Sequence, residues 1–275
     1  MAINFDINDY DLFIFDVEGV LVDDIDNPKR FEDAYKFMTY LKNEKKQFVC
    51  LSNIGRKSHR YIYENLKKLG FPVTPENIFS AGRLATLYFK ENGYENARIY
   101  LISEGGVLED FLRAGLNIVS NPPVDFVVVA MDRGLTYQKL NFAARMLLEG
   151  AKLIGVGGGF IVEGTYLGEK GKFLGEEAFV YMLSKATSIK PIMIGKPHKI
   201  IFDIILSSYQ VDRSKVIIIG DKLETDIKGG KKAGIHTMLI NRGRYGKEIL
   251  DKLDDNERPD FTINSFDDIF TTSKD

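Results

Sequence analysis

The sequence predicts an α/β protein: a parallel sheet covered by helices, into which a second α/β domain is inserted. Three observations support this prediction. Short apolar, β-branched runs alternate with segments of helical period, which is the pattern of a helix-covered parallel sheet. The runs form one group towards the two ends of the chain and a separate group in the middle. The chain of 275 residues, 44% of them hydrophobic, is long enough for two domains of ordinary size.

The first group opens with a buried strand over Leu12–Phe15, and its second strand covers Phe48–Leu51. The apolar residues between these strands recur at helical spacing, which predicts a βαβ unit; they are Phe31, Ala34, Tyr35, Met38 and Leu41. An amphipathic helix over Tyr61–Leu69 ends at Gly70. A proline-containing connection then leads into a further helix, which starts near Gly82.

The middle group has strands and helices of its own, which indicates an inserted α/β domain. Its strands are expected at Arg98–Ile102, Phe126–Ala130 and Lys152–Val156, and its helices at Val107–Ala114, Tyr137–Glu149 and Glu176–Lys185. The first pattern resumes after Pro191, with strands at Val216–Ile219, Thr237–Ile240 and Phe261–Ile263. We therefore expect a core domain made of residues 1–82 and 190–275, and an inserted domain of residues 83–189.

Composition excludes several classes of protein. The formal net charge of −2 gives no basic face for nucleic acid. No run of about 18 apolar residues could cross a bilayer, and the N-terminus lacks the pattern of a signal peptide. The single cysteine, Cys50, lies in an apolar run and is expected to be a buried core residue. A cytoplasmic protein with small-molecule partners, and with no nucleic acid or membrane partner, is expected.

Polar side chains gather where the core strands end. Because ligands bind beyond the carboxyl ends of strands in open parallel sheets, these side chains are candidates for one site. They are Asp16 and Glu18, Ser52 and Asn53, Lys196 in the segment IMIGKP, and Asp221 and Asp226 after VIIIG. Converging carboxylates repel one another unless a cation lies between them, and oxygen ligands favour Mg²⁺. A lysine and a hydroxyl beside that ion would bind phosphate, and a carboxylate in line with phosphorus would act as a nucleophile.

Six stretches, in this order and spacing, resemble the haloacid dehalogenase (HAD) superfamily of hydrolases, and within it the NagD-like, para-nitrophenyl phosphatase subfamily (class IIA). They are FIFDVEGVL, LSNIGRKS, PENIFSAGRLATLYF, VDFVVVAMDRGLTYQKL, IGKPHKIIFDIIL and GDKLETDIKGGKKAGI. The resemblance covers most of the chain. It implies a Rossmann-like parallel-sheet core with an α/β cap domain inserted between the second and third motifs.

The resemblance also implies roles for single residues. Asp16 is the nucleophile that forms an aspartyl-phosphate, and its carboxylate ligates Mg²⁺. Glu18 is the general acid and base, and its backbone carbonyl is a further metal ligand. The remaining roles are phosphate binding by Ser52 and the backbone amide of Asn53, charge compensation by Lys196, and Mg²⁺ binding by Asp221 with support from Asp226.

Three departures from the family pattern bear on activity and specificity. The family has aspartate where this chain has Glu18, and often a second asparagine where it has Ile54. The stretch 155–159 lacks the family's Thr-Asn-x-Asp sequence. Its glycines do not fit dinucleotide binding, because Phe160 stands where the third glycine belongs. We expect Gly157 and Gly158 to lie in a cap loop that approaches the substrate closely.

The function predicted is that of a Mg²⁺-dependent phosphatase acting on a small phosphorylated metabolite. Two alternatives stay open: a degenerate member that binds a phosphate ligand or a partner without turnover, and a phosphotransferase. A homodimer formed through the cap also stays open. At the level of single residues, Asp226 could cap or solvate a helix start, Ser52 could be an N-cap, and Lys196 could be an exposed turn lysine.

Overall fold

The computed structural model describes residues 5–271. Its contacts divide the chain into two compact units. The core unit comprises the described parts of 1–52 and 196–275 together with Arg60–Phe79, and the inserted unit comprises Asn53–His59 and Ser80–Gly195. The divisions expected from the sequence, after residues 82 and 189, differ from these by three and six residues, and the assignment of segment 53–59 to the inserted unit was not predicted.

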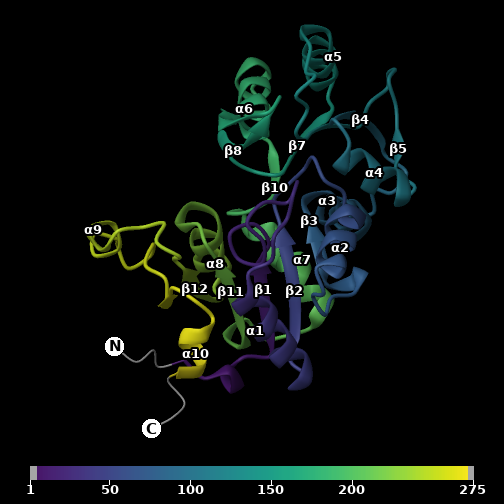
Figure 1. Cartoon of the computed structure of the whole chain (residues 1–275). Helices are drawn as coiled ribbons and strands as arrows, with labels where there is room; N and C mark the ends of the chain where they lie inside the picture. Colours follow the sequence, from purple (N-terminus) through teal and green to yellow (C-terminus); the bar gives the residue numbers. More distant parts are fainter. Residues whose placement is uncertain (1–4, 272–275) are drawn as a thin grey trace. The chain divides into compact units, whose positions relative to one another are not determined.

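The core unit contains a six-stranded sheet (Figure 1). Its strand order is β13 (Phe261–Ile263), β12 (His236–Ile240), β11 (Val216–Gly220), β1 (Leu12–Asp16), β2 (Gln47–Ser52) and β3 (Ile78–Ser80). The central strand β1 pairs in parallel with both β11 and β2, and all five of its residues are buried. The predicted parallel α/β core is thus confirmed.

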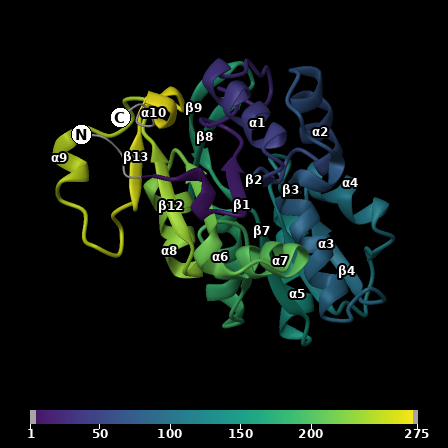
Figure 2. The same ribbon diagram turned by 90° about the horizontal axis from the view of Figure 1, so that it is seen from below.

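Helices cover both faces of this sheet. Figure 2 shows α1 and α10 on one face and α7 and α8 on the other. The helices of this part of the chain are α1 (Glu32–Asn43), α2 (His59–Lys68), α7 (Lys199–Tyr209), α8 (Lys228–Ala233), α9 (Lys247–Leu250) and α10 (Asp267–Thr271). Three 3-10 turns, η1 (Ile7–Asp9), η2 (Pro75–Asn77) and η3 (Arg213–Lys215), and one π-helical turn, η4 (Leu223–Ile227), complete it.

The aromatic core explains why α1 lies against β1. The Phe37 ring of α1 lies 6.2 Å from Phe13 and 6.1 Å from Phe15, both on β1, and it stacks on Phe266 at 4.9 Å. All four side chains are fully buried. Acidic residues Glu32 and Asp33 in the first turn of α1 match the positive end of the helix dipole. This packing therefore fixes the position of β1 relative to α1, and with it the position of the residues that follow β1.

The strand order of the core sheet indicates where a ligand would bind. The chain runs outward from β1 through β2 to β3, and after the inserted unit it returns to the opposite side of β1, at β11. The chain order thus reverses between β1 and β11, and ligands bind beyond the carboxyl ends of strands at such a switch point. Asp16 is the last residue of β1, and Asp221 directly follows β11.

The inserted unit has a parallel sheet of its own. Its strand order is β10 (Ile192–Ile194), β7 (Lys152–Val156), β6 (Phe126–Val129), β4 (Arg98–Ile102) and β5 (Asn117–Ile118). The helices of this unit are α3 (Ala81–Glu91), α4 (Gly106–Arg113), α5 (Tyr137–Leu148) and α6 (Glu176–Thr187). A separate antiparallel hairpin joins β8 (Ile161–Tyr166) to β9 (Glu169–Leu174).

Two features of the inserted unit differ from the expected pattern. The segment after Pro191 was expected to resume the core, but β10 pairs in parallel with β7. The β8–β9 hairpin was not predicted, because its second strand is almost entirely exposed and has no apolar alternation. Within residues 5–271, no helix combines the length and the apolar character needed to span a membrane.

Candidate active site

Lys196 is the centre of a buried group of charges in the core unit. Its Nζ lies 2.6 Å from Oδ1 of Asp16 and 2.7 Å from Oδ1 of Asp226. The side chain of Lys196 is 2% exposed, so it is not the exposed turn lysine that the sequence left open. Asp226 is fully buried, which excludes a role as a solvated helix start. Asp16 is the last residue of β1, Lys196 lies in the segment between β10 and α7, and Asp226 belongs to η4.

Asp221 belongs to the same group, and one of its carboxylate oxygens has no hydrogen-bond partner among the described residues. Carboxylate oxygens of Asp16, Asp221 and Asp226 all lie within 4.8 Å of one another. Oδ1 of Asp221 is buried and accepts no hydrogen bond from any residue in the range 5–271. A buried acceptor left in this state is costly unless an ion or water meets it. An all-oxygen donor set suits a hard divalent cation such as Mg²⁺, so these residues fit the expected metal.

Local packing explains how Asp226 reaches the site. The amide of Asp226 donates to the carbonyl of Lys222 at 3.0 Å within the π-helical turn η4, and its Oδ2 accepts from the amide of Lys222 at 3.1 Å. A Cβ at Gly220 would lie 2.1 Å from the Cβ of Asp226, so only glycine permits this packing. The sequence GDKLETD therefore builds a tight turn that points an acid back into the sheet edge. Single π turns of this kind recur at functional sites.

The shared charges shift the pKa values of the group. Burial, and then the charge of Asp16, raises the pKa of both Asp221 and Asp226 above the usual range of a carboxyl. Burial alone would favour the neutral amine of Lys196, but the charges of Asp16 and Asp226 outweigh it and raise the pKa of the lysine. Lys196 is therefore a fixed positive charge. The carboxylates, by contrast, favour a bound cation.

Glu18 is not one of the three carboxylates of this cluster. Its Oε1 accepts a hydrogen bond from the amide of Ile25 at 2.9 Å, within the loop that follows β1. Glu18 and Val22 also form an isolated parallel bridge. The longer side chain of glutamate thus brings its carboxylate to the backbone amide of Ile25 in the same loop. The roles of Glu18 as acid/base and as a metal ligand stay predictions.

Gly19 is a turn position that brings this loop against Asp221. Its φ is +82°, a conformation that L side chains rarely adopt, and a Cβ there would lie 2.3 Å from Oδ2 of Asp221. The amide of Gly19 donates to the carbonyl of Val22 at 2.7 Å, which closes the turn. The glycine of DVEG therefore allows close contact with the last motif, as well as the tight turn expected from the sequence.

The phosphate-binding candidates follow β2. Leu51 is paired with Asp16 in the sheet register, so Ser52 lies one residue beyond the level of Asp16 at the adjacent strand end. Ser52 is buried, at 2% exposure. Asn53 and Ile54 belong to the segment Asn53–His59, which makes its contacts with the inserted unit. Phosphate binding by Ser52 and Asn53 stays a prediction.

The glycine loop of the inserted unit rests on two acids at the start of α6. Oε1 of Glu176 accepts from the amide of Gly158 at 2.7 Å, and Oε2 of Glu177 accepts from the amide of Gly159 at 3.0 Å. Any Cβ at Gly157, where φ is +108°, would collide with the Glu176 carboxylate. Burial raises the pKa of Glu176 to about 7. Substrate contact by Gly157 and Gly158 stays a prediction, and the sequence did not reveal Glu176, because acids are common at helix starts.

Arg244 is a further residue that the sequence did not reveal. Its Nη2 lies 2.9 Å from Oδ2 of Asp221, and its side chain is 38% exposed. It lies in the loop after β12, two strands from β1, where no motif drew attention to it. The only available signal was its position at the carboxyl end of a core strand.

Comparisons with known proteins agree with this geometry. The model of the haloacid dehalogenase-like hydrolase family matches residues 13–117, and that of the HAD-hydrolase-like family matches residues 193–269. The chain is 27% identical to the 5′-nucleotidase YutF of Bacillus subtilis (strain 168), over 93% of this chain and 96% of that protein. It is 28% identical to an acid sugar phosphatase of Staphylococcus epidermidis, over 85% of this chain and 87% of that protein.

A solved structure shows the same fold. The p-nitrophenyl phosphatase from Archaeoglobus fulgidus superposes with a TM-score of 0.86 at 25% identity, covering 96% of this chain and 99% of that one. The first model runs from β1 into the inserted unit and includes Asp16, and the second begins at residue 193 and includes Lys196, Asp221 and Asp226. The family models, the curated relatives and the solved structures thus agree in matching this chain to hydrolases of the haloacid dehalogenase type, with p-nitrophenyl phosphatases among the structures that share its fold.

Proposed function

We propose that this phosphoric monoester hydrolase uses Mg²⁺ and hydrolyses a small phosphorylated metabolite through an aspartyl-phosphate on Asp16. One observation carries the proposal: the buried carboxylate of Asp16 ends the central strand and shares its Oδ1 with Lys196 at 2.6 Å. A carboxylate can attack an anionic phosphate ester only where positive charge offsets the repulsion between them. Lys196 supplies part of that charge at the reacting group itself.

The residues divide the reaction into two steps. The amide of Val17 and the Nζ of Lys196 both donate to Oδ1 of Asp16, and we assign the attack on phosphorus to Oδ2. As the Oδ2–P bond forms, the bond from phosphorus to the leaving oxygen breaks, and Glu18 donates a proton to that oxygen. Glu18 then takes a proton from water, whose oxygen attacks phosphorus and releases the Asp16 carboxylate and inorganic phosphate.

Asp16, Asp221 and Asp226 are the residues that would hold Mg²⁺, together with the backbone carbonyl of Glu18. Their fit rests on the cluster of carboxylate oxygens and on the unmet Oδ1 of Asp221. When bound, the ion supplies positive charge against the transferring phosphoryl group. We assign phosphate binding to Ser52 and to the amide of Asn53, which follow the adjacent strand.

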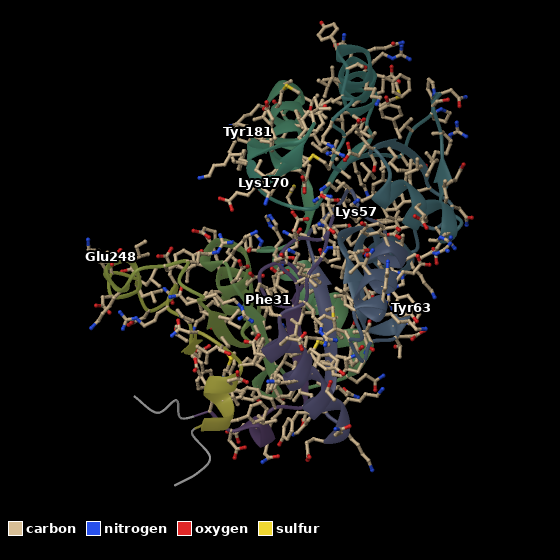
Figure 3. The ribbon with its side chains drawn as sticks, viewed as in Figure 1. Phe31, Lys57, Tyr63, Lys170, Tyr181 and Glu248 are labelled. Carbon is tan, nitrogen blue, oxygen red and sulfur yellow. The ribbon has the colours of Figure 1, made fainter. Side chains whose placement is uncertain are left out.

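Substrate choice is assigned to the inserted unit, with Gly157 and Gly158 as substrate contacts. The names of the relatives, 5′-nucleotidase and acid sugar phosphatase, point to nucleoside monophosphates and sugar phosphates as classes to compare. The inserted unit also carries exposed apolar side chains, which supports a homodimer formed through it. They include Phe160, Ile161, Leu174, Tyr181 and Met182; the Phe160 and Tyr181 rings lie 5.7 Å apart, and Figure 3 labels Tyr181.

The deciding experiment measures phosphate release from para-nitrophenyl phosphate, nucleoside monophosphates and sugar phosphates, with Mg²⁺ and with excess EDTA. The proposal expects release that requires Mg²⁺ and disappears in Asp16→Asn, whose amide cannot attack phosphorus. Transfer to an added alcohol in place of water would establish the phosphotransferase alternative. If the wild type releases phosphate from none of the esters but still binds them, the chain is a non-catalytic member.

A further inference from the structure

The loop after β12 holds an arginine in place beside the acid cluster. Nδ2 of Asn241 donates to the carbonyl of Tyr245 at 2.9 Å, and Oδ1 of Asn241 accepts from the amide of Tyr245 at 2.8 Å. The amide of Arg244 donates to the carbonyl of Asn241 at 2.7 Å. Oη of Tyr245 accepts from the amide of Leu223, in η4, at 3.1 Å. The loop is therefore fixed to itself and to the motif that contains Asp221 and Asp226.

The two arginines of this loop have different partners. Nη2 of Arg242 lies 2.9 Å from Oδ1 of Asp33, and its guanidinium carbon lies 4.1 Å from the centre of the Phe31 ring, a residue that Figure 3 labels. Arg244 instead reaches Asp221. The loop thus directs Arg244 to one acid of the site while Arg242 holds the start of α1.

The two carboxylate oxygens of Asp221 have different surroundings because only one of them contacts Arg244. Oδ2 lies 2.9 Å from Nη2 of Arg244, and it faces Gly19, where a Cβ would approach it to 2.3 Å. Oδ1 is buried and meets no hydrogen-bond donor among the described residues. With Oδ2 engaged on one side, the carboxylate cannot rotate without breaking the ion pair with Arg244.

We propose that Arg244 is a positioning residue of the metal site: it fixes the Asp221 carboxylate so that Oδ1 faces the cation. The inference rests on the proposed function, because it assumes that Asp221 is a metal ligand. A hydrogen bond to a ligating carboxylate from outside the coordination sphere orients that ligand, and losing such a partner typically weakens metal binding about 10–100-fold. Charge repulsion between Arg244 and the cation opposes this effect, but the guanidinium is partly exposed, so solvent screens its charge.

The two effects have opposite signs, which makes the proposal testable. If orientation dominates, Arg244→Gln weakens Mg²⁺ binding, and Arg244→Lys, which keeps the charge but not the planar fork, lies between the mutant and the wild type. If repulsion dominates, Arg244→Gln tightens Mg²⁺ binding. The control is Arg213→Gln, since Arg213 pairs with Asp203 at 2.6 Å and has a similar exposure of 40%.

The experiment titrates the full-length protein with Mg²⁺ in a calorimeter, without substrate, at fixed pH and ionic strength. The expected result is a dissociation constant about 10-fold or more higher for Arg244→Gln, with no change for Arg213→Gln. Unchanged or tighter binding in Arg244→Gln overturns the proposal. If Arg244→Gln does not fold, Arg244→Lys decides by the same criterion, because it too must bind Mg²⁺ more weakly than the wild type.

The phosphatase assay separates failure of this inference from failure of the proposed function. If the wild type binds Mg²⁺ and releases phosphate while Arg244→Gln binds Mg²⁺ equally well, only the role of Arg244 is wrong. If the wild type binds no Mg²⁺, the metal assignment of Asp221 is wrong and the role of Arg244 is wrong with it. If the wild type binds Mg²⁺ but hydrolyses no ester, the proposed function fails and the calorimetric comparison still decides the role of Arg244.

Discussion

The Nζ of Lys196 lies 2.6 Å from Oδ1 of Asp16, although 180 positions separate the two residues in the chain. Both side chains are buried, at 2% and 9% exposure. Removing two charges from water costs free energy that their attraction repays only with good geometry, so a buried pair is weak evidence for stability. Its presence at the end of the central strand is better explained by chemistry. The pair nevertheless makes the fold depend on the lysine.

We expect Lys196→Met to lower the free energy of unfolding by about 3–5 kcal/mol, because it leaves Asp16 and Asp226 buried without a counter-charge. Lys199→Met is the matched control: Lys199 lies three residues after Lys196 and pairs with Asp203 at 2.6 Å, but both of these side chains are at least 41% exposed. An exposed pair of this kind contributes only about 0.3–0.5 kcal/mol. Urea unfolding near neutral pH in EDTA compares them, and equal effects of the two substitutions would show that the Lys196 pair is not buried as described.

Gly19→Ala should cost both stability and Mg²⁺ affinity, since its Cβ would meet Asp221. The control is Gly93→Ala, because Gly93 has a similar φ of +71° with nothing within 4 Å of the added Cβ, whereas Gly19 has φ +82° and a contact of 2.3 Å. Both substitutions carry the strain of a left-handed backbone, about 1–2 kcal/mol. Thermal unfolding and Mg²⁺ calorimetry measure the difference. Comparable losses in the two variants would mean that the turn, and not the contact with Asp221, explains the glycine.

The strand ends of the site could be predicted from the sequence because the underlying rule is local. Asp16 and Asp221 each follow an apolar run, and parallel strands present their carboxyl ends at one edge. Asp226 could not be decided in this way, since its burial depends on the packing of Gly220 and on a π-helical turn. The parallel core and three strands of the inserted unit, β4, β6 and β7, were likewise predicted from apolar runs that alternate with helical segments.

Other features depend on pairings that no local pattern encodes. The segment Ile192–Ile194 could serve as an edge strand of either sheet, and its pairing with β7 is decided by packing, such as Met193 against Gly155. Arg244 lies in a loop without a motif. In the sequence, Glu176 resembles an ordinary acid at a helix start, and only its packing against Gly157 in the structure distinguishes it. In each case the deciding contact joins distant parts of the chain.

Glu18 gives a prediction in which two substitutions act on different properties. Glu18→Gln keeps an acceptor for the buried amide of Ile25 but removes the acid, so stability should hold while hydrolysis of alkyl phosphates falls more than that of para-nitrophenyl phosphate. Nitrophenolate leaves without a proton, whereas an alkoxide needs one. Steady-state rates on both ester classes provide the measurement. If Glu18→Gln changes neither rate, Glu18 is not the general acid.

Glu18→Asp tests the length of the side chain. The shorter carboxylate cannot reach the amide of Ile25, now 2.9 Å from Oε1 of Glu18, and the unmet amide should cost about 1–3 kcal/mol. Activity should fall as well, because the loop that carries the acid is loosened. Thermal unfolding measured beside the rates separates the two losses. A gain in rate with unchanged stability would show that the loop is not adapted to glutamate.

Glu176→Gln should flatten the pH dependence of stability between about pH 5 and 8. Burial raises the pKa of Glu176 from 4.5 to about 7, so the folded protein holds a proton that the unfolded chain releases. The stability that this group contributes is therefore complete below pH 4.5 and is lost as pH rises through 7. A shift of this size corresponds to a loss on the order of 3 kcal/mol.

Glutamine keeps the acceptor for the amide of Gly158 without the charge, so the wild type should lose more stability than Glu176→Gln as the pH rises. Urea unfolding at a series of pH values measures the difference. Glu177→Gln serves as the control, because it removes one charge from the same helix start, where Glu177 accepts from Gly159 but is only partly buried. If Glu177→Gln flattens the curve as much as Glu176→Gln does, the effect belongs to the start of α6 in general. If neither substitution changes the curve, the Glu176 carboxylate is not desolvated beneath the glycine loop.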